Sequence, residues 1–133
     1  MNPIKILLAE DNPVNQKVAE LMLRRIGYEI DIESNGEKAI EALKKHGHQI
    51  VLMDAHMPVM DGLEATRWIR KNIPPENQPI VFVMTATLMT EARDAWRGIQ
   101  VEGFIEKPVR VDFLKKQIDK AVQEIRDAQN PEN

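Results

Sequence analysis

The sequence predicts an α/β fold, in which five parallel strands form a doubly wound sheet with five helices on its two faces. Short apolar runs of strand length alternate along the chain with segments whose apolar residues recur at helical spacing. No internal repeat or long linker interrupts this order. The alternation is typical of βαβ units, in which helices cover both faces of a parallel sheet.

The first strand and helix lie at the N-terminal end of the chain. Residues 4–9 form an apolar run that stops at Glu10 and Asp11. Asn12 suits the N-cap of a helix, and Pro13 suits its first position. The apolar residues that predict an amphipathic helix here are Val14, Val18, Leu21 and Met22.

Two strands and two helices follow. Residues 28–33 alternate apolar and acidic side chains, which is typical of an edge strand with one wetter face. Residues 39–43 carry the apolar positions of a second helix. The continuous apolar run 50–53 ends on Asp54 and predicts a strand buried on both faces. Residues 61–62 then open a third helical pattern.

The second half of the chain repeats this pattern. Residues 80–84 form another continuous apolar run, which ends on Thr85. A weaker helical pattern covers residues 89–96. Phe104 begins a short strand that stops before Lys107, and a last helix follows.

The last helix and the chain length indicate one domain. Residues 114–125 carry a clear apolar helical face, whereas residues 127–133 are polar. A chain of 133 residues with 43% hydrophobic side chains can bury one core. We therefore expect a domain over residues 1–126 and a polar C-terminal tail over residues 127–133.

Composition and charge exclude several classes of function. The formal net charge is −3, and Lys and Arg are dispersed among acids, so direct nucleic-acid binding is not expected. The absence of cysteine excludes disulfides and thiolate chemistry, and the three histidines have no familiar metal-binding spacing. No apolar run approaches membrane-spanning length, and no signal-peptide pattern is present. We expect a cytoplasmic protein without a membrane partner.

Polar side chains follow the predicted strands at the points where they end. Glu10 and Asp11 follow the first strand, Asp54 ends the third, Thr85 ends the fourth and Lys107 follows the fifth. The carboxyl ends of parallel strands meet at one edge of a sheet, where such folds place their functional crevice. We therefore expect three carboxylates, a hydroxyl and an amine to share one rim.

This set of groups suits phosphoryl chemistry. Three neighbouring carboxylates cannot all stay ionised without compensation, and a magnesium ion with oxygen ligands compensates them best. Lys107 and Thr85 supply a charge and a hydroxyl that can hold a phosphoryl group, and Asp54 can be the nucleophile. Taken singly, Asp54 could cap a turn and Lys107 could form a simple ion pair. Their shared position favours a site.

Four segments resemble the receiver domain of two-component response regulators. They are ILLAEDNPVNQ, VLMDAHMPVMDGLEATRWIR, VMTAT and GFIEKPV, and they cover nearly the whole chain in the right order. Their form is closest to the receivers of hybrid sensor histidine kinases. The resemblance implies a flavodoxin-like sheet with strand order 2-1-3-4-5. It also implies that the chain is either a single-domain regulator or a receiver cut from a larger protein.

The resemblance implies a role for each acid. Asp54 is the expected phosphoacceptor in a phosphorelay. Glu10 and Asp11 are expected to bind Mg²⁺ directly or through water, together with Asp54. The backbone carbonyl of His56 is expected to be a further ligand of the ion.

The resemblance also implies partners and a switch. The phosphoryl group would come from a phosphohistidine of a sensor histidine kinase or a histidine phosphotransfer domain. Thr85 and Lys107 would bond it, Thr85 would move toward it, and the aromatic ring of Phe104 would turn inward. This would change the face of the fourth helix, fifth strand and fifth helix, which a downstream partner, an output domain or a second copy in a dimer would read. A cis bond between Lys107 and Pro108 is expected.

Two residues near the rim are candidates for tuning the reaction rate. His56 and Thr87 each lie two positions after a predicted site residue. We hypothesise that they control water access and thereby the dephosphorylation rate. An alternative is that His56 is a solvated loop residue. Trp96 could likewise be an exposed docking residue or part of the core.

Two other classes of function remain open at this point. A haloacid dehalogenase-type enzyme also forms an aspartyl phosphate with magnesium, but it normally carries a second aspartate where this chain has His56. A docking module that has lost phosphorylation would have no need of the crowded acids. We therefore expect a signalling phosphoacceptor that assists its own phosphorylation and dephosphorylation, and not a turnover enzyme.

Overall fold

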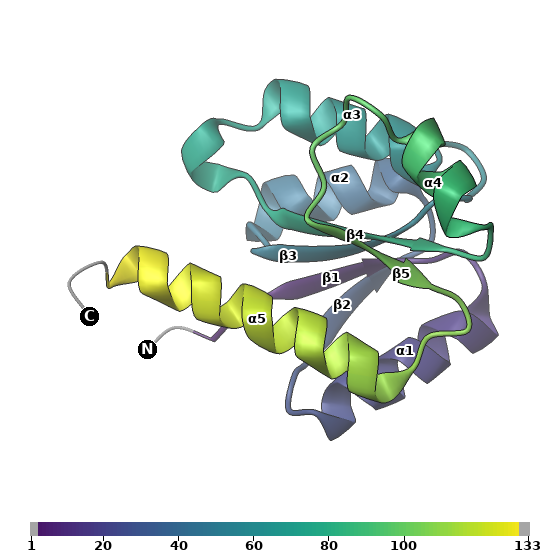
Figure 1. Ribbon diagram of the computed structural model, residues 1–133. Helices are drawn as coiled ribbons and strands as arrows, with labels where there is room; N and C mark the ends of the chain where they lie inside the picture. Colours follow the sequence, from purple (N-terminus) through teal and green to yellow (C-terminus); the bar gives the residue numbers. More distant parts are fainter. Residues whose placement is uncertain (1–2, 131–133) are drawn as a thin grey trace.

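Five strands form one parallel sheet in the order β2-β1-β3-β4-β5 in the computed structural model, which describes residues 3–130 (Figure 1). This confirms the predicted fold class and strand order. The strands are β1 (Ile6–Ala9), β2 (Ile30–Glu33), β3 (Ile50–Asp54), β4 (Ile80–Thr85) and β5 (Gly103–Glu106).

Helices cover both faces of this sheet. The helices α1 and α5 lie on one face, and α2, α3 and α4 lie on the other (Figure 1). Their bounds are α1 (Pro13–Arg25), α2 (Gly36–His46), α3 (Gly62–Asn72), α4 (Met89–Ala95) and α5 (Val111–Gln129), with a 3₁₀ turn at Pro75–Asn77. None of the helices in residues 3–130 combines the length and apolar character needed to cross a membrane.

The C-terminal helix extends into the segment that was expected to be a tail. Since α5 continues to Gln129, residues 127–129 are helical. Residues 131–133 of the expected tail lie outside the described part of the chain. The helical segment thus ends three residues later than the predicted domain boundary.

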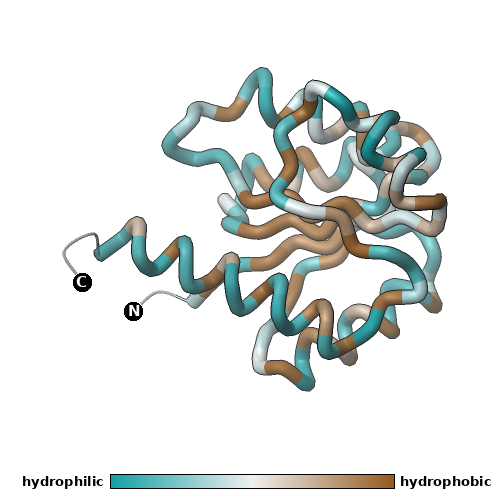
Figure 2. Tube along the Cα trace, viewed as in Figure 1, coloured by the Kyte–Doolittle hydropathy of each residue, from teal (hydrophilic) through white to brown (hydrophobic). Residues whose placement is uncertain are grey.

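The core consists of two layers separated by the sheet. Because successive strand residues face opposite sides, Leu7 and Ala9 belong to the layer beneath α2, α3 and α4, whereas Ile6 and Leu8 belong to the layer beneath α1 and α5. All residues of β3 are buried, as the continuous apolar run predicts. Figure 2 shows the apolar strands in the middle and helices of mixed polarity outside.

The parallel register brings the ends of the strands to one edge. Asp54, the last residue of β3, lies beside Met84 of β4. Thr85, the last residue of β4, lies beside Glu106 of β5, and Lys107 follows immediately. The rim that holds the predicted site residues is therefore a consequence of the strand register.

Side-chain caps begin three of the helices. The Asn12 side chain accepts hydrogen bonds from two backbone N–H groups of α1, at 2.9 and 3.1 Å, which confirms the predicted cap. Asn35 caps α2, and Asp61 forms a capping box with Glu64 at the start of α3. These caps fix the points at which the chain leaves the rim.

Of the four apolar residues that predicted an amphipathic α1, Met22 packs against the core, but the other three do not. Val14, Val18 and Leu21 are 70%, 45% and 54% exposed. Ala19 and Leu23 are the buried residues of this helix instead. Helical spacing identifies a stripe but not the direction in which it points, and here a smaller stripe packs on the sheet.

The residues between α4 and β5 are held by one arginine. Arg70 of α3 donates from Nε to the Gln100 carbonyl at 2.8 Å and from Nη1 to the Pro79 carbonyl at 2.9 Å. Its Nη2 pairs with Glu102 at 3.0 Å. The start of β4 and the loop before β5 are therefore tied to the same side chain.

Candidate functional site

Three carboxylates lie together where β1 and β3 end. Glu10 and Asp11 directly follow β1, and Asp54 is the last residue of β3. One carboxylate oxygen of each lies within 4.8 Å of the others. Glu10 and Asp54 are buried, at 2% and 5% exposure, whereas Asp11 is exposed. The structure thus brings together the three acids that were predicted to share one rim because each lies at the end of a strand.

Lys107 lies between two of these acids. Its Nζ donates to Glu10 Oε1 at 2.7 Å and pairs with Asp54 Oδ2 at 3.1 Å. Burial favours the neutral amine, but the hydrogen bond to Glu10 and the charge and hydrogen bond of Asp54 outweigh it, so the pKa of Lys107 is raised. The amine beside Asp54 therefore carries its charge. The Lys107–Pro108 bond is cis, as the resemblance implied.

The donor set of this cluster fits a hard divalent cation. Lys107 brings one positive charge against three carboxylates. Within residues 3–130, no hydrogen bond or ion pair engages the Asp11 carboxylate. Mg²⁺ is bound by one or two carboxylates together with waters and phosphate oxygens, and the exposed Asp11 leaves room for such ligands.

The loop after Asp54 is held by contacts that only glycine permits. A Cβ at Gly62 would overlap the Asp54 carbonyl oxygen. A Cβ at Gly36 would approach the Met60 carbonyl oxygen to 2.6 Å, and the Gly36 N–H donates to that oxygen at 2.8 Å. In the same loop, the His56 N–H donates to Asp54 Oδ1 at 3.3 Å, and the His56 side chain is exposed.

Thr85 is buried at the end of β4 and contacts Thr87. The two hydroxyl oxygens lie 2.8 Å apart, and the Thr87 N–H donates to the Thr85 hydroxyl at 3.1 Å. Thr85 is 1% exposed, while Thr87 is half-buried. The two threonines therefore form one hydroxyl pair at the edge of the rim.

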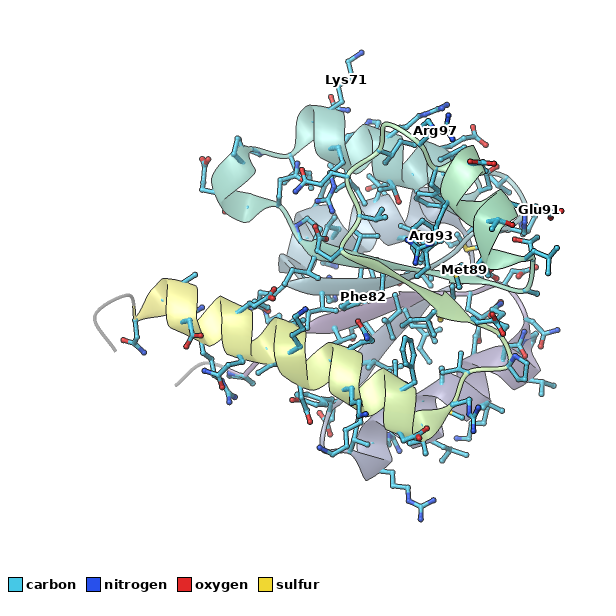
Figure 3. All side chains as sticks on the ribbon, viewed as in Figure 1. Lys71, Phe82, Met89, Glu91, Arg93 and Arg97 are labelled. Atoms are coloured by element: carbon cyan, nitrogen blue, oxygen red, sulfur yellow. The ribbon has the colours of Figure 1, made fainter. Side chains whose placement is uncertain are left out.

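The Phe104 ring contacts Arg93 of α4 and Trp96, the residue that caps the end of α4. The Arg93 guanidinium lies over it, 5.6 Å from the ring centre, and the Trp96 ring meets it edge-on at 6.4 Å. Figure 3 shows Arg93 on α4, on the side toward the sheet. Trp96 is buried at 4% exposure, so of the two interpretations of this residue, the core one is correct.

One contact to the acid pair was not expected from the sequence. The Gln16 side-chain amide donates to the Glu10 carbonyl at 2.6 Å. Gln16 lies inside the segment ILLAEDNPVNQ that carries the resemblance. No spacing rule for helices or strands marks a glutamine at this position, so the contact becomes visible only when α1 is placed beside β1.

The fold and this rim define an α/β domain that holds a buried aspartate within a metal-compatible acid cluster. Comparison with known families narrows this class, because residues 6–119 match the response regulator receiver domain. The chain belongs to this family. The resemblance stated from the sequence is therefore confirmed.

Relatives with this domain are histidine kinases of distant organisms. Histidine kinase 5 of Arabidopsis thaliana is 34% identical over 84% of this chain, which corresponds to 15% of that kinase. The autoinducer 2 sensor kinase/phosphatase LuxQ of Vibrio cholerae is 34% identical over 87% of this chain, or 13% of its own length. The chain therefore spans only a small part of these relatives.

Solved receiver domains have the same fold. The receiver domain of the sensor histidine kinase PA1611 from Pseudomonas aeruginosa has a TM-score of 0.82 and 30% identity, over 92% of this chain and 99% of that one. That structure holds a magnesium ion in its active-site cleft. A signal receiver domain from Vibrio parahaemolyticus has a TM-score of 0.87 at 22% identity over 99% of both chains, which supports the fold.

Proposed function

We propose that this domain accepts a phosphoryl group on Asp54 in two-component phosphorelay signalling. The donor is the phosphohistidine of a sensor histidine kinase or a histidine phosphotransfer domain. The observation that carries the proposal is the position of Asp54, buried beside Glu10, Asp11 and Lys107 in a chain of the receiver family. We place the reaction in the cytoplasm, where ATP-dependent donor kinases work. The domain is a switch and not a turnover enzyme.

Four residues would hold the metal ion of this reaction. Glu10, Asp11 and Asp54 would bind Mg²⁺ through their carboxylates, and His56 would add its backbone carbonyl. The bound ion supplies positive charge that neutralises the transferred phosphoryl group. The spacing of the three carboxylates and the ion in the related PA1611 receiver support this assignment.

Asp54 supplies the nucleophile of the transfer. One of its carboxylate oxygens attacks phosphorus as the P–N bond to the donor imidazole breaks, and the imidazole nitrogen keeps the electron pair. Lys107, 3.1 Å from Asp54 Oδ2, keeps its proton and stabilises the charge on the phosphoryl oxygens. Thr85 supplies a hydroxyl donor from the end of β4. By the same contacts the domain assists its own phosphorylation and dephosphorylation.

The phosphodonor would dock on the exposed side of α1. Val14, Val18 and Leu21 form an exposed apolar stripe at helical spacing there, and exposed apolar stripes of this kind are typical of protein-docking sites. A cavity of about 210 Å³ beside α1 is lined in part by Glu10 and Lys107. Val18 belongs both to the stripe and to the lining of this cavity, which suits a donor helix that docks on α1 and presents its histidine to the rim.

The response would pass from Thr85 through Phe104 to the face formed by α4, β5 and α5. Thr85 moves toward the phosphoryl group, and Phe104 turns inward into the space that it leaves. The contacts of Phe104 with Arg93 and Trp96 support a link to α4. A downstream protein, an output domain or a second copy in a dimer reads this face.

His56 and Thr87 would tune the lifetime of the phosphoryl group by controlling water access. The support is their position: the His56 N–H donates to Asp54 Oδ1 while its side chain is exposed, and the Thr87 hydroxyl contacts that of Thr85. The half-life of the acyl phosphate in His56→Ala, compared with the parent chain, tests this role. An unchanged half-life would contradict this role for His56.

Intact mass measurement tests the central proposal. The chain is incubated with Mg²⁺ and acetyl phosphate, and a single phosphate adduct is expected. The adduct should be absent from Asp54→Asn, which preserves side-chain size, and present in Asp112→Asn, which changes an exposed acid of α5. Removal of Mg²⁺ with a chelator should also prevent it.

The other functions predict different outcomes of the same experiment. Continuous release of phosphate at an enzymatic turnover rate would favour a haloacid dehalogenase-type hydrolase. No adduct under any condition would favour a docking module. An adduct that persists in Asp54→Asn would assign phosphorylation to another residue and contradict the proposal.

A further inference from the structure

Gln16 of α1 binds the backbone of the acid pair. The ladder pairs of β1 with both neighbouring strands end at Ala9, so the Glu10 carbonyl lies beyond them. The Gln16 Nε2 amide donates to this oxygen at 2.6 Å. A partly buried carbonyl without a partner would be costly, and Gln16 prevents that.

This bond completes the contacts of Glu10. Its N–H donates to the Glu33 carbonyl at 3.0 Å. Its carboxylate accepts from Lys107 Nζ at 2.7 Å and from the Asn12 N–H at 3.2 Å. Each polar group of Glu10 therefore has a partner, and Gln16 is the one that holds the peptide leading into the next acid.

The direction of Asp11 depends on this peptide. Within residues 3–130, no hydrogen bond or ion pair holds the Asp11 carboxylate. The Glu10 carbonyl and the Asp11 N–H belong to the same planar unit, so a donor on the carbonyl fixes the plane from which Asp11 projects. Rotation of that plane would move one carboxylate away from the other two, whose oxygens now lie within 4.8 Å of it.

We propose that Gln16 is a positioning residue for the metal site: by holding the Glu10 carbonyl, it directs the Asp11 carboxylate toward the acid cluster. A neutral amide does this without placing a second cation beside Lys107, where it would compete with Mg²⁺. Because the role concerns Mg²⁺ binding, it rests on the proposed function. The hydrogen bond itself is a property of the metal-free chain.

Titration of the purified chain with Mg²⁺ alone, followed by NMR of the backbone amides near the rim, tests this role. Gln16→Met removes the donor and retains side-chain length and helix propensity. It should weaken Mg²⁺ binding roughly ten-fold, as expected when a group that orients a metal ligand is lost. Gln16→Asn retains an amide that is too short to reach the carbonyl, and it should weaken binding in the same direction.

Gln78 offers a matched control. Its Nε2 amide donates to the backbone carbonyls of Ile69 and Ile73, at 2.7 and 2.6 Å, before the amino-terminal end of β4. Gln78→Met should lower the midpoint of thermal unfolding and leave Mg²⁺ affinity unchanged. A purely structural Gln16 would show this same pattern.

Each result supports or overturns the role. Unchanged Mg²⁺ affinity in folded Gln16→Met or Gln16→Asn overturns it, as does an equal loss of affinity in Gln78→Met. If neither Gln16 variant folds, the hydrogen exchange rate of the Gln16 side-chain amide is measured by NMR in the parent chain. Rapid exchange would contradict the hydrogen bond to the Glu10 carbonyl and overturn the role. A parent chain that binds no Mg²⁺ overturns both this role and the proposed metal site. If only the positioning role of Gln16 is wrong, the parent chain should still form the phosphate adduct on Asp54.

Discussion

The two sides of the rim are anchored in different ways. On the side of β1 and β3, α1 and α3 begin with side-chain caps, and the loop after Asp54 packs against Gly36 and Gly62. On the side of β4 and β5, α4 has seven residues and no side-chain cap. It begins after Leu88, whose side chain is 69% exposed. One rim therefore combines a fixed acid cluster on the side of β1 and β3, which we call the acid side, with a weakly anchored helix on the side of β4 and β5, which we call the reporting side.

This difference suits the proposed function, in which the domain both accepts a phosphoryl group and reports it to a partner. A nucleophile and its metal ligands need fixed geometry. A reporting element needs two packings of similar free energy. A missing N-cap costs about 1 kcal/mol, and a helix of this length is not stable by itself in water. The α4 segment is therefore the element through which a change at the rim would be transmitted most easily.

The largest expected effect is on the acid side, at Gly62. In Gly62→Ala, the new Cβ would overlap the Asp54 carbonyl oxygen and lie 2.9 Å from Met53 Cγ. Both neighbours are buried, so the loop and the end of β3 must shift. We expect a loss of about 3 kcal/mol in the free energy of unfolding, measured with urea, and slower phosphorylation by acetyl phosphate.

Gly98 is the matched glycine on the other side. Its φ of +84° is unfavourable for alanine, but a Cβ there would meet no atom within 4 Å. Gly98→Ala should therefore cost only about 1 kcal/mol and leave phosphorylation unchanged. Equal losses in the two variants would contradict the idea that the acid side is the more tightly packed one.

Lys107 is expected to have the next largest effect. Lys107→Met leaves Glu10 and Asp54, both buried, without their cation. Because Lys107 is partly exposed, we expect a loss below the full value for a buried pair, about 2 kcal/mol at pH 7 without Mg²⁺. Lys115→Met, which removes an exposed lysine paired with Asp119, should have a much smaller effect.

The contribution of Lys107 should also depend on pH. Its pKa is raised in the folded chain, so the folded state holds the proton more tightly than the unfolded state does. Its stabilisation is therefore complete below the ordinary lysine value of 10.5 and decreases as the pH rises through the folded pKa. Urea unfolding at a series of alkaline pH values should show the difference between parent and Lys107→Met becoming smaller. A difference that grows with pH would contradict this pairing.

The sequence predicted the strands, their ends and one helix cap better than it predicted the contacts between the helices and the sheet. Continuous apolar runs identified β3 and β4, and the rule that parallel strands end at one edge placed Asp54, Thr85 and Lys107 on one rim. The cap at Asn12 was also predicted, because side-chain capping depends on neighbouring residues only. Predictions from such local sequence signals do not depend on how distant segments of the chain pack together.

Other features depend on packing between distant segments, and the sequence could not specify them. The stripe of Val14, Val18 and Leu21 has the same helical spacing whether it faces the sheet or water. The Gln16 contact and the position of Trp96 against Phe104 arise only when helices are placed on the sheet. Hydrophobic pattern predicts which elements form, and the tertiary arrangement decides which face each one buries.

The smallest expected effect on stability is at Arg93, on the reporting side. Arg93→Met removes the charge over the Phe104 ring but retains an apolar side chain, so we expect a loss of only about 0.5 kcal/mol. Arg97→Met, which removes an exposed arginine paired with Asp94, is the control.

Phosphorylation of Asp54 in Arg93→Met should proceed at the parent rate, because the acid side is unchanged. The fluorescence of Trp96, measured in a Trp68→Phe background, should nevertheless respond differently to phosphorylation, because Phe104 is released from one of its two contacts with α4. A small loss of stability combined with an altered Trp96 signal would separate the reporting side from the chemistry, whereas slower phosphorylation in Arg93→Met would show that the two sides are not independent.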